Sequence, residues 1–219
     1  MKHPFSKKFF IVLMIAVAVP ALSMSQEIVK GDLRFVVNDD GNSVTVYKSK
    51  ANVKGELVIP ESVIHEGNEY TVTAIGEEAF DFCDITSAVI PGTVTEIGPR
   101  AFLLSALTSV SIPNSVTIID SQAFSQCCNL TSITLPASVS TIGALALECC
   151  ENLKSLTFPE SVNDIGAGAL YGCYGLTSVT IKNPDITMGS GIFVGCERLT
   201  SLTIGNKVIS KKELRSLIR

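Results

Sequence analysis

The sequence lacks tryptophan and contains only two histidines, His3 and His65. Imidazole is the usual general base near neutral pH, so a Ser-His-Asp arrangement would have to be built around His65, which lies in a predicted turn. The short glycine pairs at 166–168 and 189–191 have no lysine after them and do not form a phosphate-binding loop signature. We therefore expect no enzyme activity and no cofactor.

Basic residues are scarce along most of the chain. Without Lys2, Lys7 and Lys8 near the N-terminus, 14 of the 17 basic residues stand against 21 acidic ones, a net formal charge of −7. An acidic body repels nucleic acid and anionic membranes, so we expect neither as the main partner. The exception is the segment 206–219, which carries five basic residues and one acidic residue and is expected to be a solvated helix end.

The chain has one long apolar run, Phe9 to Val19, and it is too short to span a bilayer. Lysines precede it, and Pro20 and small residues follow, which is the order of a secretory signal peptide. We predict a signal peptide over residues 1–25, cleaved before Gln26; the alternative is a membrane anchor. With the signal removed we expect no membrane span and an exported protein, either secreted, periplasmic or at the cell surface.

A repeated unit dominates the rest of the sequence. The apolar residue that closes each "LTSxTI" run recurs at an almost constant interval, at Ile90, Ile112, Leu135, Phe158, Ile181 and Ile204. A fixed period of about 23 residues is typical of a solenoid, in which each unit stacks on its neighbours. We predict one such domain over residues 56–205.

Each unit combines a strand, a corner and a short helical pattern. In LTSITLP the apolar residues alternate with Ser132 and Thr134, which indicates a half-buried strand, and Pro136 ends it because proline has no N–H to donate. Ala123, Phe124 and Cys127, spaced i, i+1 and i+4, favour a one- or two-turn helix. Strands and helices in alternation predict an α/β solenoid with parallel strands.

Atypical segments flank the repeats. Residues 26–55 contain two alternating apolar runs joined by NDDGN, which predicts a β-hairpin that caps the first coil. The first coil is nine residues longer than the next because of a turn projecting at 65–69. At the other end, Ser210 and Glu213 form a capping-box pattern, so we predict a short C-terminal cap helix within 206–219.

One aromatic column is interrupted. The predicted helices place phenylalanine at 80, 102, 124 and 193, but leucine at 147 and 170. Because protein cores keep a near-constant packing density, we predict that Phe158 is buried and fills the volume left at Leu147 and Leu170.

Seven cysteines allow several interpretations. Five of them occupy one column of the repeat, Cys83, Cys127, Cys150, Cys173 and Cys196, with Ser105 in the remaining place. This period favours buried free thiols used as small core residues. A metal site is disfavoured because ligands stacked about 5 Å apart form a line rather than surround one point. The next alternative is a disulfide between Cys128 and Cys149, which lie off the column in neighbouring units; seven is odd, so at least one thiol stays unpaired.

The outward strand positions are the best candidates for binding a partner, because solenoids use such continuous faces. They form a row of small hydroxyls without aromatic or arginine residues, and the projecting turn offers more varied chemistry. The candidate contacts are Ser109, Ser111, Ser132, Thr134, Ser155, Thr157, Ser178, Thr180, Ser201, Thr203, His65, Glu66, Asn68 and Tyr70.

The unit "LxxIxIPxSVTxIGxxAFxxCxN" resembles the BspA-like, or treponemal-type, leucine-rich repeat over about residues 56–205. The resemblance implies right-handed coils of about 23 residues. It also implies a secreted or cell-surface protein, like known members of the family, some of which bind host matrix or plasma proteins and promote adhesion. We therefore expect binding of a protein or glycan at the cell surface or host matrix, without catalysis. The alternative is a structural spacer or subunit of a surface assembly with no ligand of its own.

Overall fold

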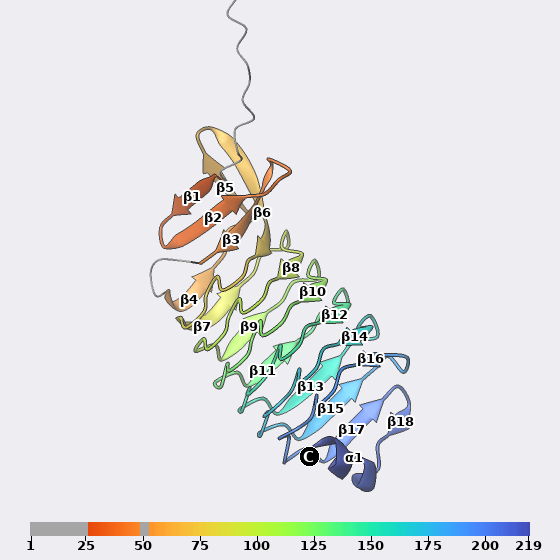
Figure 1. Ribbon diagram of the computed structural model, residues 1–219. Helices are drawn as coiled ribbons and strands as arrows, with labels where there is room; N and C mark the ends of the chain where they lie inside the picture. Colours follow the sequence, from red (N-terminus) through yellow and green to blue (C-terminus); the bar gives the residue numbers. More distant parts are fainter. Residues whose placement is uncertain (1–25, 49–52) are drawn as a thin grey trace, which may run out of the picture.

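The computed structural model describes residues 26–48 and 53–219 of the chain, so the predicted signal peptide lies outside the described residues. The protein is a β-solenoid, an elongated stack of coils with a strand-rich cap at the N-terminal end and one helix at the other (Figure 1). No helix of the described residues is long and apolar enough to cross a membrane.

The N-terminal cap has three antiparallel strands. The predicted hairpin is formed by β2 (Leu33–Val37) and β3 (Ser43–Tyr47), and an additional strand, β1 (Glu27–Lys30), pairs with β2. Strand β3 then pairs in parallel with β6 (Asn68–Ile75), so the cap sheet continues directly into the solenoid. The cap thereby covers the open edge that the first coil would otherwise expose.

The projecting turn of the first coil is the tip of a second hairpin. Strand β5 (Ser62–His65) pairs with β6 in antiparallel register, with His65 opposite Asn68. Glu66 and Gly67 at the tip have φ values of 50° and 82°. The nine additional residues therefore extend one strand of the solenoid into a hairpin.

Two parallel ladders run along the stack. The first carries the predicted LTSxTI strands and is divided into two sheets, with β18 added in antiparallel register at the end. Its strands are β4 (Lys54–Val58), β7 (Asp84–Val89), β9 (Ser109–Ser111), β11 (Ser132–Thr134), β13 (Ser155–Phe158), β15 (Ser178–Ile181), β17 (Ser201–Ile204) and β18 (Lys207–Val208).

The second ladder continues from β6 and consists of two-residue strands just before each corner. Its strands are β8 (Glu96–Ile97), β10 (Ile118–Ile119), β12 (Thr141–Ile142), β14 (Asp164–Ile165) and β16 (Thr187–Met188). The glycine at the corner after β12, Gly143, is required by close approach, since a Cβ there would overlap the amide nitrogen of Ser121 in the preceding coil.

The predicted short helix of each coil is wrong. Its place is taken by a five-residue turn segment whose first and fifth residues both have positive φ. In the segment 122–126, the N–H groups of the first, third and fifth residues donate to carbonyl oxygens of the next coil over 2.9, 2.8 and 2.7 Å. A helix would direct these N–H groups to its own carbonyls, whereas the turn uses them to join neighbouring coils.

The inward side chains form one continuous core. The rings of Phe80, Phe102 and Phe124 are fully buried and stack with centroid separations of 5.4 and 5.3 Å. Leu147 and Leu170 continue the column, and Phe158, with 0% exposure, belongs to the same core cluster. The burial of Phe158 agrees with the prediction, and its filling of the space beside the two leucines stays a prediction.

The C-terminal end is capped by α1 (Lys211–Leu217). Ser210 and Glu213 form the predicted capping box, in which each side chain binds the other residue's backbone N–H. The carbonyl of Ile218 accepts a hydrogen bond from the N–H of Gly195 at 3.1 Å. It takes the place of the carbonyl that a further coil would present to this N–H. Leu214 is buried and fixes the helix to the last coil.

Candidate functional site

The predicted hydroxyl residues form two parallel rows on the outward face of the first ladder, which we call the hydroxyl face. Ser109, Ser132 and the serines of β13, β15 and β17 make one row, and their registers pair them from coil to coil within each sheet. Seven of the ten predicted contact residues on this face are exposed; Ser178, Thr180 and Thr203 are half-buried. Alternation along the strand therefore places all ten on one surface.

The hydroxyl face is interrupted between β11 and β13, where the two sheets of the first ladder meet. In the coils around this break, a threonine before each strand donates both its N–H and its hydroxyl to the carbonyl one coil earlier, as Thr131 does to Thr108 and Thr200 does to Thr177. Lys154 occupies the equivalent place in the fourth coil and has no hydroxyl. Within the described residues, no hydrogen bond joins it to Thr131.

A groove of about 400 Å³ lies across this break. Hydroxyls of both strands reach into it, and Lys182 supplies its one cation. The lining residues are Ser132, Ile133, Thr134, Leu135, Ser155, Thr157, Pro159 and Lys182. The groove is within the range of ligand pockets and combines donors, acceptors and one positive charge.

Lys182 was not among the residues predicted from the sequence. The signal was present, because the residue after the strand is proline at 91, 113, 136 and 159 and lysine only in the fifth coil. Its N–H donates to the carbonyl of Phe158 at 3.1 Å, which a proline could not do. This departure from the repeat places an ammonium group at the edge of the hydroxyl face.

The predicted contact residues on the hairpin of β5 and β6 differ in their exposure. Glu66 and Asn68 at the tip are exposed and His65 is half-buried, with its Nε2 3.9 Å from the carboxylate of Glu66. Tyr70 is a correction to the sequence prediction: it is only 7% exposed because the alternation of β6 turns its ring into the core. The tip therefore offers three polar side chains and no aromatic one.

The cysteine column has a polar function that its spacing did not reveal. Cys127, Cys150 and Cys173 donate their thiols to carbonyl oxygens of the preceding coil at 3.1, 3.3 and 3.1 Å. Cys196 does the same at 3.2 Å. These acceptors are the backbone oxygens of the inward Phe or Leu of each turn, so the column satisfies buried carbonyls as well as filling space.

Burial sets the ionisation of these thiols. It raises the pKa of Cys127 to about 11, against a smaller opposing effect of the hydroxyl of Ser105, and raises the pKa of Cys196 to about 11. The pKa values of Cys150 and Cys173 are also raised, chiefly by burial. A thiol with a raised pKa is a poor nucleophile and a poor metal ligand at neutral pH, so the column is structural.

Cys128 and Cys149 lie close together at the coil surface and are both free, like the other five cysteines. The thiol of Cys128 is 3.5 Å from the carbonyl oxygen of Cys149. Both are partly buried, and burial raises the pKa of each. The structure therefore has the free-thiol arrangement, and the Cys128–Cys149 bridge stays an untested alternative.

The acidic residues of the first coil are partly neutralised. Lys48 binds both Glu78 and Asp81, at 3.3 and 3.4 Å, and Arg100 binds Glu78 at 3.1 Å. These cations, led by Arg100, hold the pKa of Glu78 below its ordinary value. No group of three or more His, Cys, Asp or Glu residues in the described ranges could hold a metal ion.

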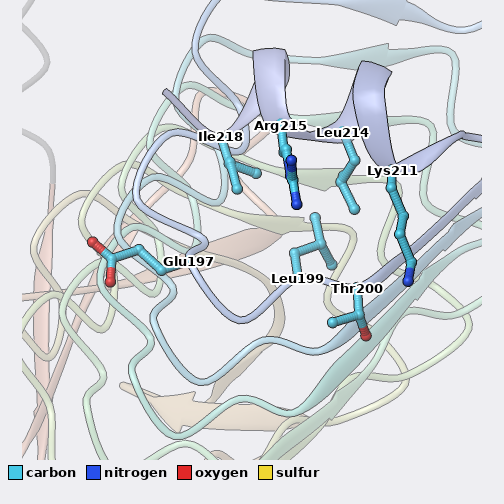
Figure 2. A pocket seen from close by; sticks show the side chains of 7 residues that line it. All are labelled: Glu197, Leu199, Thr200, Lys211, Leu214, Arg215 and Ile218. Atoms are coloured by element: carbon cyan, nitrogen blue, oxygen red, sulfur yellow. The ribbon is translucent and has the colours of Figure 1, made fainter.

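A smaller hollow of about 260 Å³ lies under the C-terminal helix (Figure 2). Lys211, Leu214 and Arg215 extend from α1 toward the last coil, where Leu199 faces them; both leucines are buried. Long side chains of this kind cover apolar surface with their stems, as expected where a cap helix packs on a coil. This hollow belongs to the cap.

Known proteins share this architecture. The BspA type leucine rich repeat region matches residues 67–105 and 96–214, in six copies. Among solved structures, a leucine-rich repeat protein from Bacteroides ovatus is 34% identical with a TM-score of 0.73, and the match covers 80% of this chain and 46% of that one. A leucine rich cell surface protein from Faecalibacterium prausnitzii is 28% identical with a TM-score of 0.66, covering 81% of this chain and 54% of that one.

The leucine-rich repeat protein of Treponema pallidum has the same fold, with a TM-score of 0.67 at 24% identity, over 88% of this chain and 94% of that one. A comparison with curated proteins finds no match. The chain spans about half the length of the Bacteroides and Faecalibacterium proteins. The six repeat copies, which extend over most of the described residues, carry the assignment: the chain belongs to the BspA type leucine-rich repeat family.

Proposed function

We propose that the protein is exported and binds a protein or glycan at the cell surface or host matrix through its hydroxyl face. The observation that carries the proposal is the groove at the break between β11 and β13, where hydroxyls of two strands and Lys182 converge. Export is supported by the apolar leader and by the cell-surface relative from Faecalibacterium prausnitzii. A rigid stack that presents polar groups at fixed spacing suits repeated contacts with an extended partner.

A second function is favoured by the composition of the same face. Its ten hydroxyl positions contain neither aromatic nor arginine side chains, which usually dominate binding energy. A structural spacer or subunit of a surface assembly would need no such residues. In that case the hydroxyl face would only have to remain exposed to water.

Retention on immobilised host matrix proteins and mucins tests the first function. Thr157→Arg fills the groove with a long cation and is expected to abolish retention of a specific partner. Thr187→Arg is the matched control, since Thr187 is an exposed strand threonine of the second ladder, away from the groove. Equal retention of the two variants would reject the groove as the binding site, and recovery of only the protein's own surface neighbours would favour the spacer.

A further inference from the structure

A second hollow, of about 390 Å³, lies before the strands β13, β15 and β17, on the side opposite to Lys182. Three coils form it. Glu151, Asn152 and Lys154 come from the fourth, Tyr174 and Gly175 from the fifth, and Glu197 and Arg198 from the sixth. We call it the Tyr174 hollow.

The backbones of the fourth and fifth coils lie directly against each other at Gly175, one of the residues that line this hollow. In the third, fourth and sixth coils the place of Gly175 is taken by Asn129, Asn152 and Arg198. A Cβ on Gly175 would overlap the carbonyl oxygen of Glu151, so the backbone of the fifth coil lies too close to its neighbour for a residue with a side chain. The hollow is therefore bounded by the side chains around Gly175, which come from all three coils.

Tyr174 forms one wall and is the one aromatic residue in its column, where the third, fourth and sixth coils have Cys128, Glu151 and Glu197. Its side chain is 47% exposed although the ring is supported from behind. The ring atom Cε1 lies 3.7 Å from the position that a Cβ on Gly195 would take. The ring therefore rests against the last coil and presents its remaining surface outward.

In the described part of the chain, the charged groups that line the hollow form no ion pairs with one another. Within the described residues, the charged side chains of Glu151, Lys154, Glu197 and Arg198 form no hydrogen bond or ion pair, although all four line the same hollow. Asn152 is held by a hydrogen bond from its Nδ2 to the carbonyl of Cys128 at 2.8 Å, which leaves Oδ1 as a fixed acceptor. Two acids and two bases give the hollow no net charge.

We propose that the Tyr174 hollow binds a neutral pyranose ring at the end of a glycan. An exposed aromatic ring provides a flat apolar surface for the C–H face of a sugar. The carboxylates and the Asn152 oxygen accept hydrogen bonds from sugar hydroxyls, while Arg198 and Lys154 donate to them. A hollow without net charge favours a neutral sugar over a sialylated or sulfated one. This inference rests on the glycan form of the proposed function and gives the class of sugar that would bind. It does not require the groove of the hydroxyl face.

Titration calorimetry with short oligosaccharides ending in galactose, glucose, mannose or N-acetylglucosamine tests the proposal, with sialylated and sulfated counterparts in parallel. We expect one or more neutral sugars to bind, and Tyr174→Ala to weaken that binding by about tenfold or more. Tyr174→Phe is expected to keep most of the affinity. Tyr171→Ala is the matched control, because Tyr171 is 43% exposed nearby but does not line the hollow.

The result that would overturn the proposal is the absence of binding by every neutral sugar, binding of the charged sugars alone, or equal loss in the Tyr171 and Tyr174 variants. Thermal unfolding of each variant shows whether the fold is kept. Thr157→Arg separates the two sites: a sugar that this variant still binds and Tyr174→Ala does not is held in the Tyr174 hollow. If Thr157→Arg loses matrix retention and Tyr174→Ala keeps it, the function proposed for the groove is supported whatever the sugar result.

Discussion

The first four turn segments and the last two have the same backbone conformation but place different kinds of residue at its positive-φ positions. Both ends of each segment have positive φ, a conformation that costs a residue with a Cβ about 1–2 kcal/mol. The last two segments place glycine at all four such positions, Gly168, Gly172, Gly191 and Gly195. The first four place other residues at all eight: Glu78, Phe82, Arg100, Leu104, Gln122, Gln126, Leu145 and Cys149.

The cores of the two regions differ as well. Three stacked phenylalanine rings fill the first three turn segments, leucines fill the fourth and fifth, and Phe193 fills the sixth, so the change in the core begins one segment before the change to glycine. At the boundary, side chains of the fourth segment extend over the fifth: a Cβ on Gly168 would meet Leu145 Cδ2 at 2.6 Å, and one on Gly172 would meet Cys149 Sγ at 2.9 Å. Inter-coil hydrogen bonds and core packing hold the four turns without glycine, while glycine avoids the strain in the last two, whether the inward residue is Leu170 or Phe193.

Of the changes that test this comparison, removal of one stacked ring is expected to lower the free energy of unfolding most. Phe102→Ala leaves a cavity between Phe80 and Phe124 and should lower the free energy of unfolding by about 3–5 kcal/mol. Urea denaturation measures it. Phe82→Ala is the control, because that ring is 63% exposed and its loss should change stability by less than about 0.5 kcal/mol. Similar losses in both variants would mean that the ring stack does not support the strained turns.

The thiol column runs through both regions and should make both sensitive to high pH. Burial raises the pKa of Cys127 and of Cys196 to about 11 from an ordinary value of 9.0. The folded state then keeps a proton that the unfolded state loses, so this stability is complete below about pH 9 and falls as the pH rises toward 11, by about 1.4 kcal/mol per pH unit for each thiol. Urea denaturation with a reductant, at several pH values in this window, measures the slope. Cys127→Ala should reduce it, and an unchanged slope would contradict the assignment.

The C-terminal helix ends the glycine-containing region and depends on its cap. Ser210→Ala removes the hydroxyl that accepts the N–H of Glu213 and should lower stability by about 1 kcal/mol. Because Ile218 accepts the N–H of Gly195, hydrogen exchange at Gly195 should also become faster. Ser216→Ala, on the same helix, is the control and should change stability by less than about 0.5 kcal/mol. Unchanged exchange at Gly195 would show that the helix does not cap the last turn.

A substitution in the last turn segment isolates the cost of the backbone conformation. Gly191 has a φ of 66°, and a Cβ there would meet nothing closer than Val194 Cγ2 at 3.7 Å. Gly191→Ala should therefore lower the free energy of unfolding by about 1 kcal/mol through strain alone, which thermal or urea unfolding measures. Gly191→Asn should lose less, since asparagine tolerates this region better. A neutral Gly191→Ala would mean that the last turn relaxes to another conformation.

The reverse change in the first region should give the smallest effect and the opposite sign. Gln126 has a φ of 58° and an exposed side chain, and its N–H donates to Glu148 of the next coil. Gln126→Gly relieves the strain but adds freedom to the unfolded chain, so we expect a gain of about 0.5 kcal/mol in thermal or urea unfolding. A loss of stability would show that the backbone there is not strained.

Much of this architecture can be predicted from spacing alone. The fixed repeat period, an alternation of apolar and hydroxyl side chains, and the prolines after most strands are local features, and they predict the coil, the first ladder and the hydroxyl face. The turn segments were mispredicted because Ala123, Phe124 and Cys127 present the same inward face in a helix and in a turn. The glycines that mark the turn conformation occur in only two of the six segments.

The candidate sites depend on neighbours that are one or two coils apart in the sequence. The Tyr174 hollow is lined by Asn152, Tyr174 and Arg198 among others, and no one coil contains all three. The groove depends in the same way on Lys182 beside Thr134 and Thr157. Lateral contacts of this kind arise only when the coils stack, because the stacking sets which departures from the repeat become neighbours. Features that repeat with the period can be predicted from the sequence, whereas the surfaces that could bind a partner form only when the coils are stacked in the solenoid.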